Sequence, residues 1–329
     1  IDLYLERINQ SEYDKSQAER VEIMLKRSEK EHDQLLRSRL MCMRAQILVQ
    51  LGFLEKAEKT FKLALRKAEQ ARLHEEVVHI FIRLGYVYLR LGDLKQGCES
   101  LRNGILEAGE YGFSVYVSEG YLMLSRIKWQ QGLFQEALFL NQESKLRYER
   151  HGMRTGLAQV ANTLGEILRA LGHLEKAEEA YKEAVRRYES IGSPTTYPKL
   201  NLAITLAERG HYEEALQGMT AVLNKVEKLD LGIVSAVRAI RLYPLASLKM
   251  WSEVTVDVER IFKPLLEGAF TDFDVARFTQ KAGRCCLENG YEKEANKLLR
   301  LALNQWESLE REEEIHQTRT LLAKLSDSD

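Results

Sequence analysis

The segment HEEVVH, from His74 to His79, contains the residue types of a zinc-protease motif. In that motif two histidines stand four residues apart, so both lie on one face of a helix and can share a metal ion. His74 and His79 are five residues apart, which rotates the second side chain by roughly 140° from the first. The spacing therefore does not favour a metal site built on these two histidines.

Four cysteines, Cys42, Cys98, Cys285 and Cys286, are the other residues that could bind metal or form disulfides. No two of them have the C-x-x-C spacing of a structural zinc site, and the pattern is not that of a disulfide framework. Cys285 and Cys286 are neighbours in an expected helix, so they point to different faces. We expect Cys286 to be a small buried apolar residue, and we expect the protein to be cytoplasmic.

Motifs for catalysis are missing from the sequence. It contains no GxxxxGK[ST] phosphate loop, no GxSxG elbow and no protein-kinase signature set. Its many carboxylates fall on expected solvated helix faces, where no apolar pocket would raise their pKa. We therefore expect this chain to be neither an enzyme nor a cofactor-binding protein.

The charge balance bears on the class of partner. The sequence has 48 basic and 49 acidic side chains, a formal net charge of −1, so it lacks the positive excess of a nucleic-acid wrapper. No apolar stretch approaches the ~20 residues of a membrane span. The first residues, Ile1 to Arg7, include Asp2, Glu6 and Arg7 rather than a signal-peptide pattern. Because the sequence begins at Ile1 rather than methionine, we expect it to be part of a longer protein.

A short signature recurs along the chain and reveals the elements that must position any site. It reads LGFLEKAE from Leu51, and weaker copies continue to NGYEKEAN from Asn289. Its marker glycines recur roughly every 40 residues, which predicts a solenoid of repeated units. These glycines are Gly52, Gly92, Gly132, Gly172, Gly210 and Gly290, with Lys249 in the remaining slot.

Each repeat is predicted to be a pair of helices. Apolar residues before Gly172 recur at steps of three and four, and so do those that follow it, which is typical of two amphipathic helices. The glycine between them can adopt the left-handed conformation that ends a helix. Small residues such as Gly165 and Ala177 recur at fixed distances from the marker, where we expect the helices to cross closely.

The register of these positions resembles the tetratricopeptide repeat. It is carried by Leu164, Gly165, Leu168, Gly172, Ala177, Tyr181 and Ala184. The resemblance implies an all-α, right-handed superhelical solenoid of antiparallel helix pairs. The period is about 40 rather than 34 residues, which implies longer helices and a wider turn between repeats. In this the chain is similar to arrays in bacterial signal-transduction ATPases and in the tails of bacterial Ser/Thr kinases.

The resemblance also implies a domain organisation. Seven repeats span residues 38–310. Residues 1–37 form an N-terminal helical cap or partial repeat, and residues 311–329 form a C-terminal capping helix and tail. In the sixth repeat Lys249 replaces the marker glycine and Pro244 lies inside the first helix, where we expect a kink.

In the tetratricopeptide family the first helix of each repeat lines a concave groove, so the resemblance projects a partner-binding face here. Its residues are Arg83, Tyr86, Arg90, Arg126, Trp129, Asn162, Glu166, Arg169 and Asn201. Counted over all repeats, these register positions hold eight basic residues and four acidic ones. The basic residues are Arg39, Arg83, Arg90, Arg126, Arg169, Arg277, Lys281 and Arg284; the acidic ones are Glu119, Glu166, Glu208 and Glu288.

The leading hypothesis is a protein-interaction scaffold or sensor that binds an acidic peptide or partner domain, as the regulatory part of a larger signal-transduction protein. One alternative is a fragment of a kinase or ATPase whose catalytic domain precedes Ile1. A less favoured alternative is nucleic-acid binding, in which arginines contact phosphates and aromatic side chains stack on bases. Self-association stays open.

Overall fold

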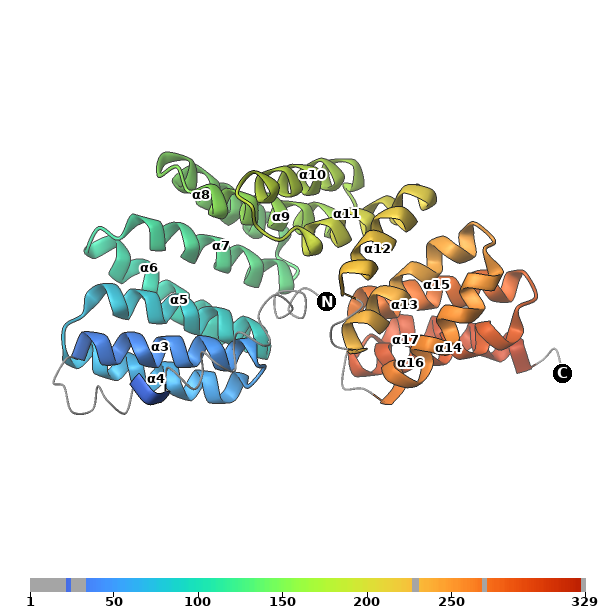
Figure 1. Cartoon of the computed structure of the whole chain (residues 1–329), viewed down its shortest axis with the longest axis horizontal. Helices are drawn as coiled ribbons and strands as arrows, with labels where there is room; N and C mark the ends of the chain where they lie inside the picture. Colours follow the sequence, from blue (N-terminus) through green and yellow to red (C-terminus); the bar gives the residue numbers. More distant parts are fainter. Residues whose placement is uncertain (1–21, 25–33, 227–230, 268–270, 327–329) are drawn as a thin grey trace. The chain divides into compact units, whose positions relative to one another are not determined.

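The structure is a computed structural model that describes residues 22–24, 34–226, 231–267 and 271–326. Every regular element named in these ranges is an α-helix (Figure 1). The helices are α3 (Gln34–Gln50), α4 (Leu54–Gln70), α5 (His74–Leu91), α6 (Leu94–Glu110), α7 (Ser114–Gln130), α8 (Phe134–Arg150), α9 (Arg154–Ala170), α10 (Leu174–Ser190), α11 (Thr196–Glu208), α12 (Tyr212–Val226), α13 (Leu231–Ser247), α14 (Trp251–Glu267), α15 (Phe273–Glu288), α16 (Glu292–Ser308) and α17 (Glu312–Ser326). The predicted all-α fold of antiparallel helix pairs is confirmed.

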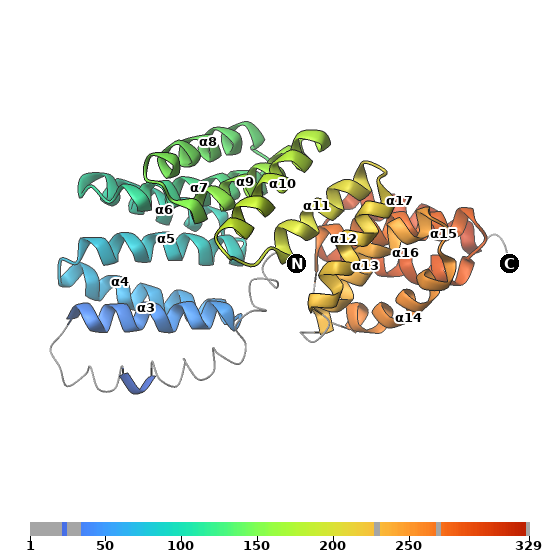
Figure 2. The same ribbon diagram turned by 45° about the horizontal axis from the view of Figure 1, so that its top comes forward.

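The described helices fall into two compact units, divided between Pro194 and Thr195. The N-terminal unit contains the pairs α3/α4, α5/α6, α7/α8 and α9/α10. The C-terminal unit contains α11/α12, α13/α14 and α15/α16, followed by α17. Within each unit the pairs follow one another in chain order (Figure 2). Most of the predicted cap at residues 1–37 lies outside the described residues.

In the N-terminal unit the first helices of successive pairs pack on one another, α3 on α5, α5 on α7 and α7 on α9. Among the described residues the second helices α4, α6, α8 and α10 show no such mutual packing. Helices α4, α6 and α8 each pack instead on the first helix of their own pair and on that of the next pair, and α10 packs on α9. The first helices are therefore closer together, and the spaces between second helices open outward.

The turns explain the 40-residue period. The marker glycines all have positive φ, between 74° and 84°. A second series of left-handed residues follows each second helix of the N-terminal unit, at Arg72, Gly112, Gly152 and Gly192. Helices of 17 or 18 residues thus alternate with short turns, and a left-handed residue recurs halfway through each repeat. Longer helices were predicted correctly. Within the N-terminal unit the predicted wider turn between repeats was wrong, because the turns after α4, α6 and α8 are as short as those within a repeat.

Lys249 replaces a glycine without changing the turn. Its φ is 57°, its N–H donates to the Ala246 carbonyl, and the next N–H, of Met250, donates to Leu245. Gly172 and His173 make the same two bonds, the pattern that closes a helix at a left-handed residue. The next helix, α14, therefore begins at the same register as after a marker glycine, although the left-handed backbone of Lys249 is strained. Nearby, α13 continues through Pro244 to Ser247, so the proline does not end the helix.

Replacing Lys249 with glycine should stabilise the protein. A left-handed conformation costs a residue with a Cβ about 1–2 kcal/mol, and the greater freedom of glycine in the unfolded chain offsets part of that gain. We expect the free energy of unfolding to rise by about 0.5–1 kcal/mol in urea denaturation. Lys249→Ala is the control, because it removes the side chain and keeps the strain. An equal gain from alanine would contradict this account.

Close crossing of the paired helices is confirmed at Gly165. A Cβ at this position would lie 2.6 Å from Cε1 of Tyr181, which is fully buried on α10. A Cβ at Gly85 would similarly lie 2.4 Å from the Leu101 side chain on α6. These glycines therefore remain in helix interiors because a bulky partner from the second helix fills the space a side chain would need.

Gly165→Ala should destabilise the protein although alanine is the better helix former. The helix gains about 1 kcal/mol from propensity, but overpacking against the Tyr181 ring costs about 1–3 kcal/mol. We expect a net fall in melting temperature. Gly109→Ala is the matched control, since Gly109 lies in α6 with nothing within 4 Å of an added Cβ, and it should raise the melting temperature. The opposite order would refute the crossing argument.

Candidate functional site

Helix α5 presents one polar stripe formed by Glu76, His79, Arg83, Tyr86 and Arg90. The steps of three and four residues place these side chains on a single helix face. Arg83 Nε donates to His79 Nε2 at 3.2 Å, and Arg90 Nη1 donates to the Tyr86 hydroxyl at 3.5 Å. The Arg90 guanidinium carbon also lies 5.9 Å from the centre of the Tyr86 ring. The stripe therefore contains two linked pairs, His79 with Arg83 and Tyr86 with Arg90, beside the Glu76 carboxylate.

Ion pairs join this stripe to the first helices on either side. Arg39 Nε of α3 lies 2.8 Å from Glu76 Oε1, and Arg83 Nη2 lies 3.0 Å from Glu119 Oε1 of α7. We call the surface formed by the first helices α3, α5, α7 and α9 the inner face. It carries Arg39, Glu76, Arg83 and Glu119, together with Arg126 and Trp129 of α7 and Asn162, Glu166 and Arg169 of α9. The close packing of these first helices holds it together.

Arg126 and Trp129 of α7 and Arg169 of α9 are half-buried. Asn162 and Glu166 of α9 are buried instead. Asn162 Nδ2 donates to Glu166 Oε1 at 2.9 Å, which fixes the two side chains against each other. Eight of the nine predicted residues thus belong to first helices of the N-terminal unit. The ninth, Asn201, is buried on α11 of the C-terminal unit.

The positive excess predicted for the first-helix register positions of all repeats is partly neutralised within the protein. Arg39 and Arg83 pair as described above, and Glu76, a partner omitted from the sequence count, lies on the same stripe. In the C-terminal unit Arg277 Nη1 lies 2.7 Å from Glu208 Oε1, and Arg284 Nε lies 2.8 Å from Glu288 Oε1. At least four of the eight predicted basic residues are therefore engaged in ion pairs, which weakens their attraction for an outside anion.

The two histidines of HEEVVH diverge, as their spacing predicted. His74 Nδ1 lies 2.8 Å from Glu107 Oε1, and the His74 ring stacks on Tyr111 with centroids 3.8 Å apart. His79 faces α3 instead. There an imidazole nitrogen of His79, the Cys42 sulfur and a Glu76 carboxylate oxygen all lie within 4.8 Å of one another. The spacing within HEEVVH does not reveal this group, because Cys42 lies on a different helix, α3.

Burial and neighbouring charge change the acid–base properties of this group. Burial, followed by the positive charges of Arg83 and Arg39, lowers the pKa of His79 to about 4. Burial, together with the negative charge of Glu76, raises the pKa of the Cys42 thiol to about 12. At neutral pH His79 is therefore an uncharged imidazole and Cys42 an uncharged thiol.

Family models described as tetratricopeptide repeat match residues 38–69, 116–190 and 162–223. The chain carries tetratricopeptide repeats. The matched segments cover the α3/α4 pair and run from α7 to α12, so they include α7 and α9 of the inner face. No curated protein matches the sequence significantly.

Solved structures resemble this tetratricopeptide-repeat chain in fold. One is a signal transduction ATPase with a tetratricopeptide-repeat sensor from Pyrococcus horikoshii, 16% identical with a TM-score of 0.61, over 87% of this chain and 46% of that chain. Another is a Rap protein complexed with competence and sporulation factor, 13% identical with a TM-score of 0.59, over 93% and 80%. A third is aspartyl phosphate phosphatase F from Bacillus subtilis, 13% identical with a TM-score of 0.61, over 86% and 74%.

The repeats place the chain among protein–protein interaction modules, a class that is generally non-catalytic. Within the part of the chain that the structure describes, no helix has the length and apolar character needed to cross a bilayer. The likeness to solved structures supports the fold alone at these low identities.

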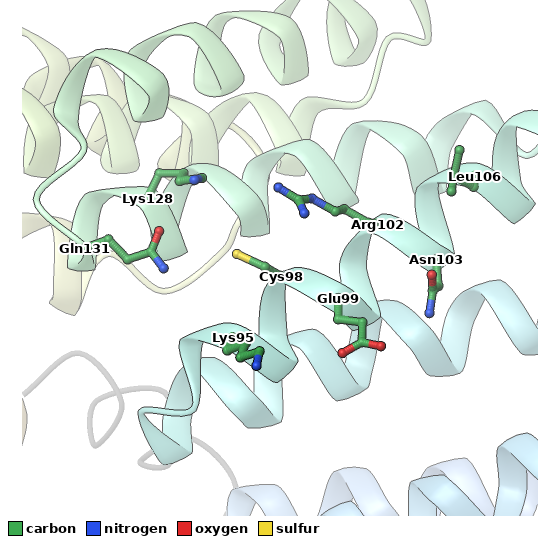
Figure 3. A pocket seen from close by; sticks show the side chains of 8 residues that line it. All are labelled: Lys95, Cys98, Glu99, Arg102, Asn103, Leu106, Lys128 and Gln131. Carbon is green, nitrogen blue, oxygen red and sulfur yellow. The ribbon is translucent and has the colours of Figure 1, made fainter.

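The tetratricopeptide-repeat stack also has an outer surface that sequence reasoning missed. Between α6 and α8, over α7, lie two adjoining cavities of about 560 and 530 Å³, which share Arg102 and Lys128 as lining residues. Figure 3 shows the charged ends of these two side chains turned toward each other. Leu106 and Phe139 at the borders are 71% and 64% exposed. We call this surface the outer trough.

Proposed function

We propose that the inner face of the N-terminal unit binds a peptide or partner domain that carries carboxylates. The observation that carries the proposal is the arrangement of half-buried arginine and aromatic side chains on adjacent first helices, with Tyr86 and Arg90 on α5 and Arg126 and Trp129 on α7. Arginine forks pair with carboxylates in a bidentate manner. Tryptophan, tyrosine and arginine are the residues that most often anchor protein interfaces.

The burial pattern supports a division of roles on this face. Asn162 and Glu166 are buried and hydrogen-bonded to each other, so we assign them to holding α9 in place rather than to first contact with a partner. Arg126, Trp129 and Arg169 keep part of their surface accessible. Contact with the partner is therefore assigned to α5, α7 and the C-terminal half of α9.

We further propose that the chain is the sensor or scaffold part of a larger signalling protein. A tetratricopeptide-repeat sensor of a signal transduction ATPase and a Rap protein bound to competence and sporulation factor share this fold. In both proposals this chain binds the partner, and any catalytic step belongs to another domain or protein.

The experiment selects binders from a random peptide display library on the purified full chain and measures their affinity by calorimetry. We expect the selected peptides to be enriched in Asp and Glu, and Arg126→Glu with Trp129→Ala to weaken binding at least about tenfold. The matched control is Arg102→Glu with Leu106→Ala, which changes an arginine and a large apolar residue in the outer trough and should leave affinity unchanged.

Two results would overturn this proposal. One is peptide binding that survives the inner-face variant and is lost in the outer-trough variant, which would place the partner on the other surface. The other is a failure to enrich acidic peptides together with tight binding of single-stranded RNA that weakens steeply with salt, because counterion release produces that dependence. The second result would favour the nucleic-acid alternative.

A further inference from the structure

We propose that Cys42, Glu76 and His79 form a binding site for a divalent metal ion of the zinc type. Their three donor atoms, a sulfur, a carboxylate oxygen and an imidazole nitrogen, all lie within 4.8 Å of one another. Ligands around one tetrahedral zinc ion stand at bonds of about 2.0–2.3 Å, so small side-chain rotations bring all three to a common ion. The inference does not depend on the proposed partner-binding function.

The helices bring these ligands together by a simple rule. Glu76 and His79 are three residues apart on α5, and residues with this spacing lie next to each other on one helix face. Helix α3 packs against α5 and presents Cys42 to the same point. Cys42 and Glu76 are both buried, and all three ligands stand on packed helices rather than on loops. The site is thus largely pre-organised, which metal coordination requires.

The donor set selects the class of metal. Thiolate and imidazole ligands suit Zn²⁺ and related transition metals, whereas Mg²⁺ and Ca²⁺ take oxygen ligands. Three protein ligands leave the fourth tetrahedral position open for water or another ligand. On binding, the Cys42 thiol would lose its proton to solvent, so that a thiolate–metal bond forms and one proton is released.

Two arginines hold these groups in the absence of metal. Arg39 Nε lies 2.8 Å from Glu76 Oε1, and Arg83 Nε donates to His79 Nε2 at 3.2 Å. The Arg39 side chain is 56% exposed and can swing into solvent. Arg83 keeps its second partner, Glu119, at 3.0 Å. Metal and Arg39 therefore compete for Glu76, and removing Arg39 should tighten metal binding.

The test is a Co²⁺ titration of the reduced full chain, without an affinity tag, followed by absorption spectroscopy. A thiolate–Co²⁺ charge-transfer band and the strong visible bands of tetrahedral Co²⁺ should appear at one equivalent, and Zn²⁺ should remove them. Cys42→Ser should abolish the charge-transfer band. Cys98→Ser and Cys286→Ser should keep it, because no described imidazole or carboxylate completes a metal-ligand group with either.

Two further variants protect the test against misfolding of Cys42→Ser. His79→Gln should weaken Co²⁺ binding at least tenfold while the far-ultraviolet circular dichroism spectrum stays helical. Arg39→Gln, at an exposed position, should lower the dissociation constant several-fold. Absence of the charge-transfer band in the wild-type chain, its persistence in Cys42→Ser, or weaker binding in Arg39→Gln would each overturn the proposal.

Discussion

Asp257→Ala will lower the free energy of unfolding of the C-terminal unit by about 3–5 kcal/mol. Asp257 is 1% exposed on α14, where its Oδ1 accepts from Arg238 Nη1 at 2.9 Å and its Oδ2 accepts from Arg241 Nε at 3.0 Å. Both arginines belong to α13 and are largely buried. Removing the carboxylate leaves two guanidinium groups in a poorly hydrated place with no counter-charge, which is the costly way to break a buried ion pair.

Urea denaturation followed by tryptophan fluorescence measures this loss. Trp251 and Trp306 both lie in the C-terminal unit, and a Trp129→Phe background removes the signal of the N-terminal unit. The matched control is Glu259→Ala, two residues along the same helix, where an exposed carboxylate pairs with Lys293 and Lys297. Its loss should be much smaller because water screens and replaces such pairs. Equal losses for the two variants would refute the argument from burial.

Most of the fold could be predicted from local patterns in the sequence. The marker glycines predicted the turns, because glycine is the residue that most readily adopts a left-handed backbone conformation. The small residues Gly85 and Gly165 predicted the helix crossings. Gly112, Gly152 and Gly192 carry the same signal halfway through each repeat. Arg72 takes the same conformation in the first of these turns, so glycine alone does not mark the whole series. The 40-residue period by itself predicted a wider turn between repeats.

The candidate site was predictable only as far as helical register reaches. Register placed Arg83, Tyr86, Arg126 and Trp129 on first helices of successive pairs. It could not show that Asn162 and Glu166 are buried, because burial depends on how tightly α7 and α9 approach each other. Ion pairs between helices are likewise contacts between residues far apart in the sequence, and nothing in a single sequence gives their geometry.

Two features could not be predicted from the sequence for the same physical reason: the Cys42, Glu76 and His79 group and the outer trough. Cys42 meets Glu76 and His79 because α3 packs on α5, and the outer trough exists because α6 and α8 do not pack on each other. Each depends on the spacing between helices of different repeats. A register assigns a residue to a face of its own helix, whereas the neighbour across that face is set by the packing of the stack.

Acid will destabilise the wild-type chain through His79. Burial, with the charges of Arg83 and Arg39, lowers the pKa of His79 to about 4 in the folded protein, against an ordinary value near 6.5 when unfolded. Between these values the unfolded chain binds a proton that the folded chain does not. The free energy of unfolding therefore falls as the pH is lowered from 6.5 to 4, by about 2–3 kcal/mol from this residue.

The groups around His79 set the sign of this effect. They are Arg39 and Cys42 from α3, Glu76 and Arg83 from α5, and Tyr116 from α7.

Urea denaturation at pH 7, 5.5 and 4, with a chelator to exclude metal, compares the wild type with His79→Gln, which cannot take up the proton. The stability difference between the two should shift by about 2–3 kcal/mol toward the variant on going from pH 7 to 4. His151→Gln, at an exposed site after α8, should follow the wild-type curve. If His79→Gln also followed it, His79 would be taking up its proton as easily in the folded chain as in the unfolded one, and burial would not govern its charge.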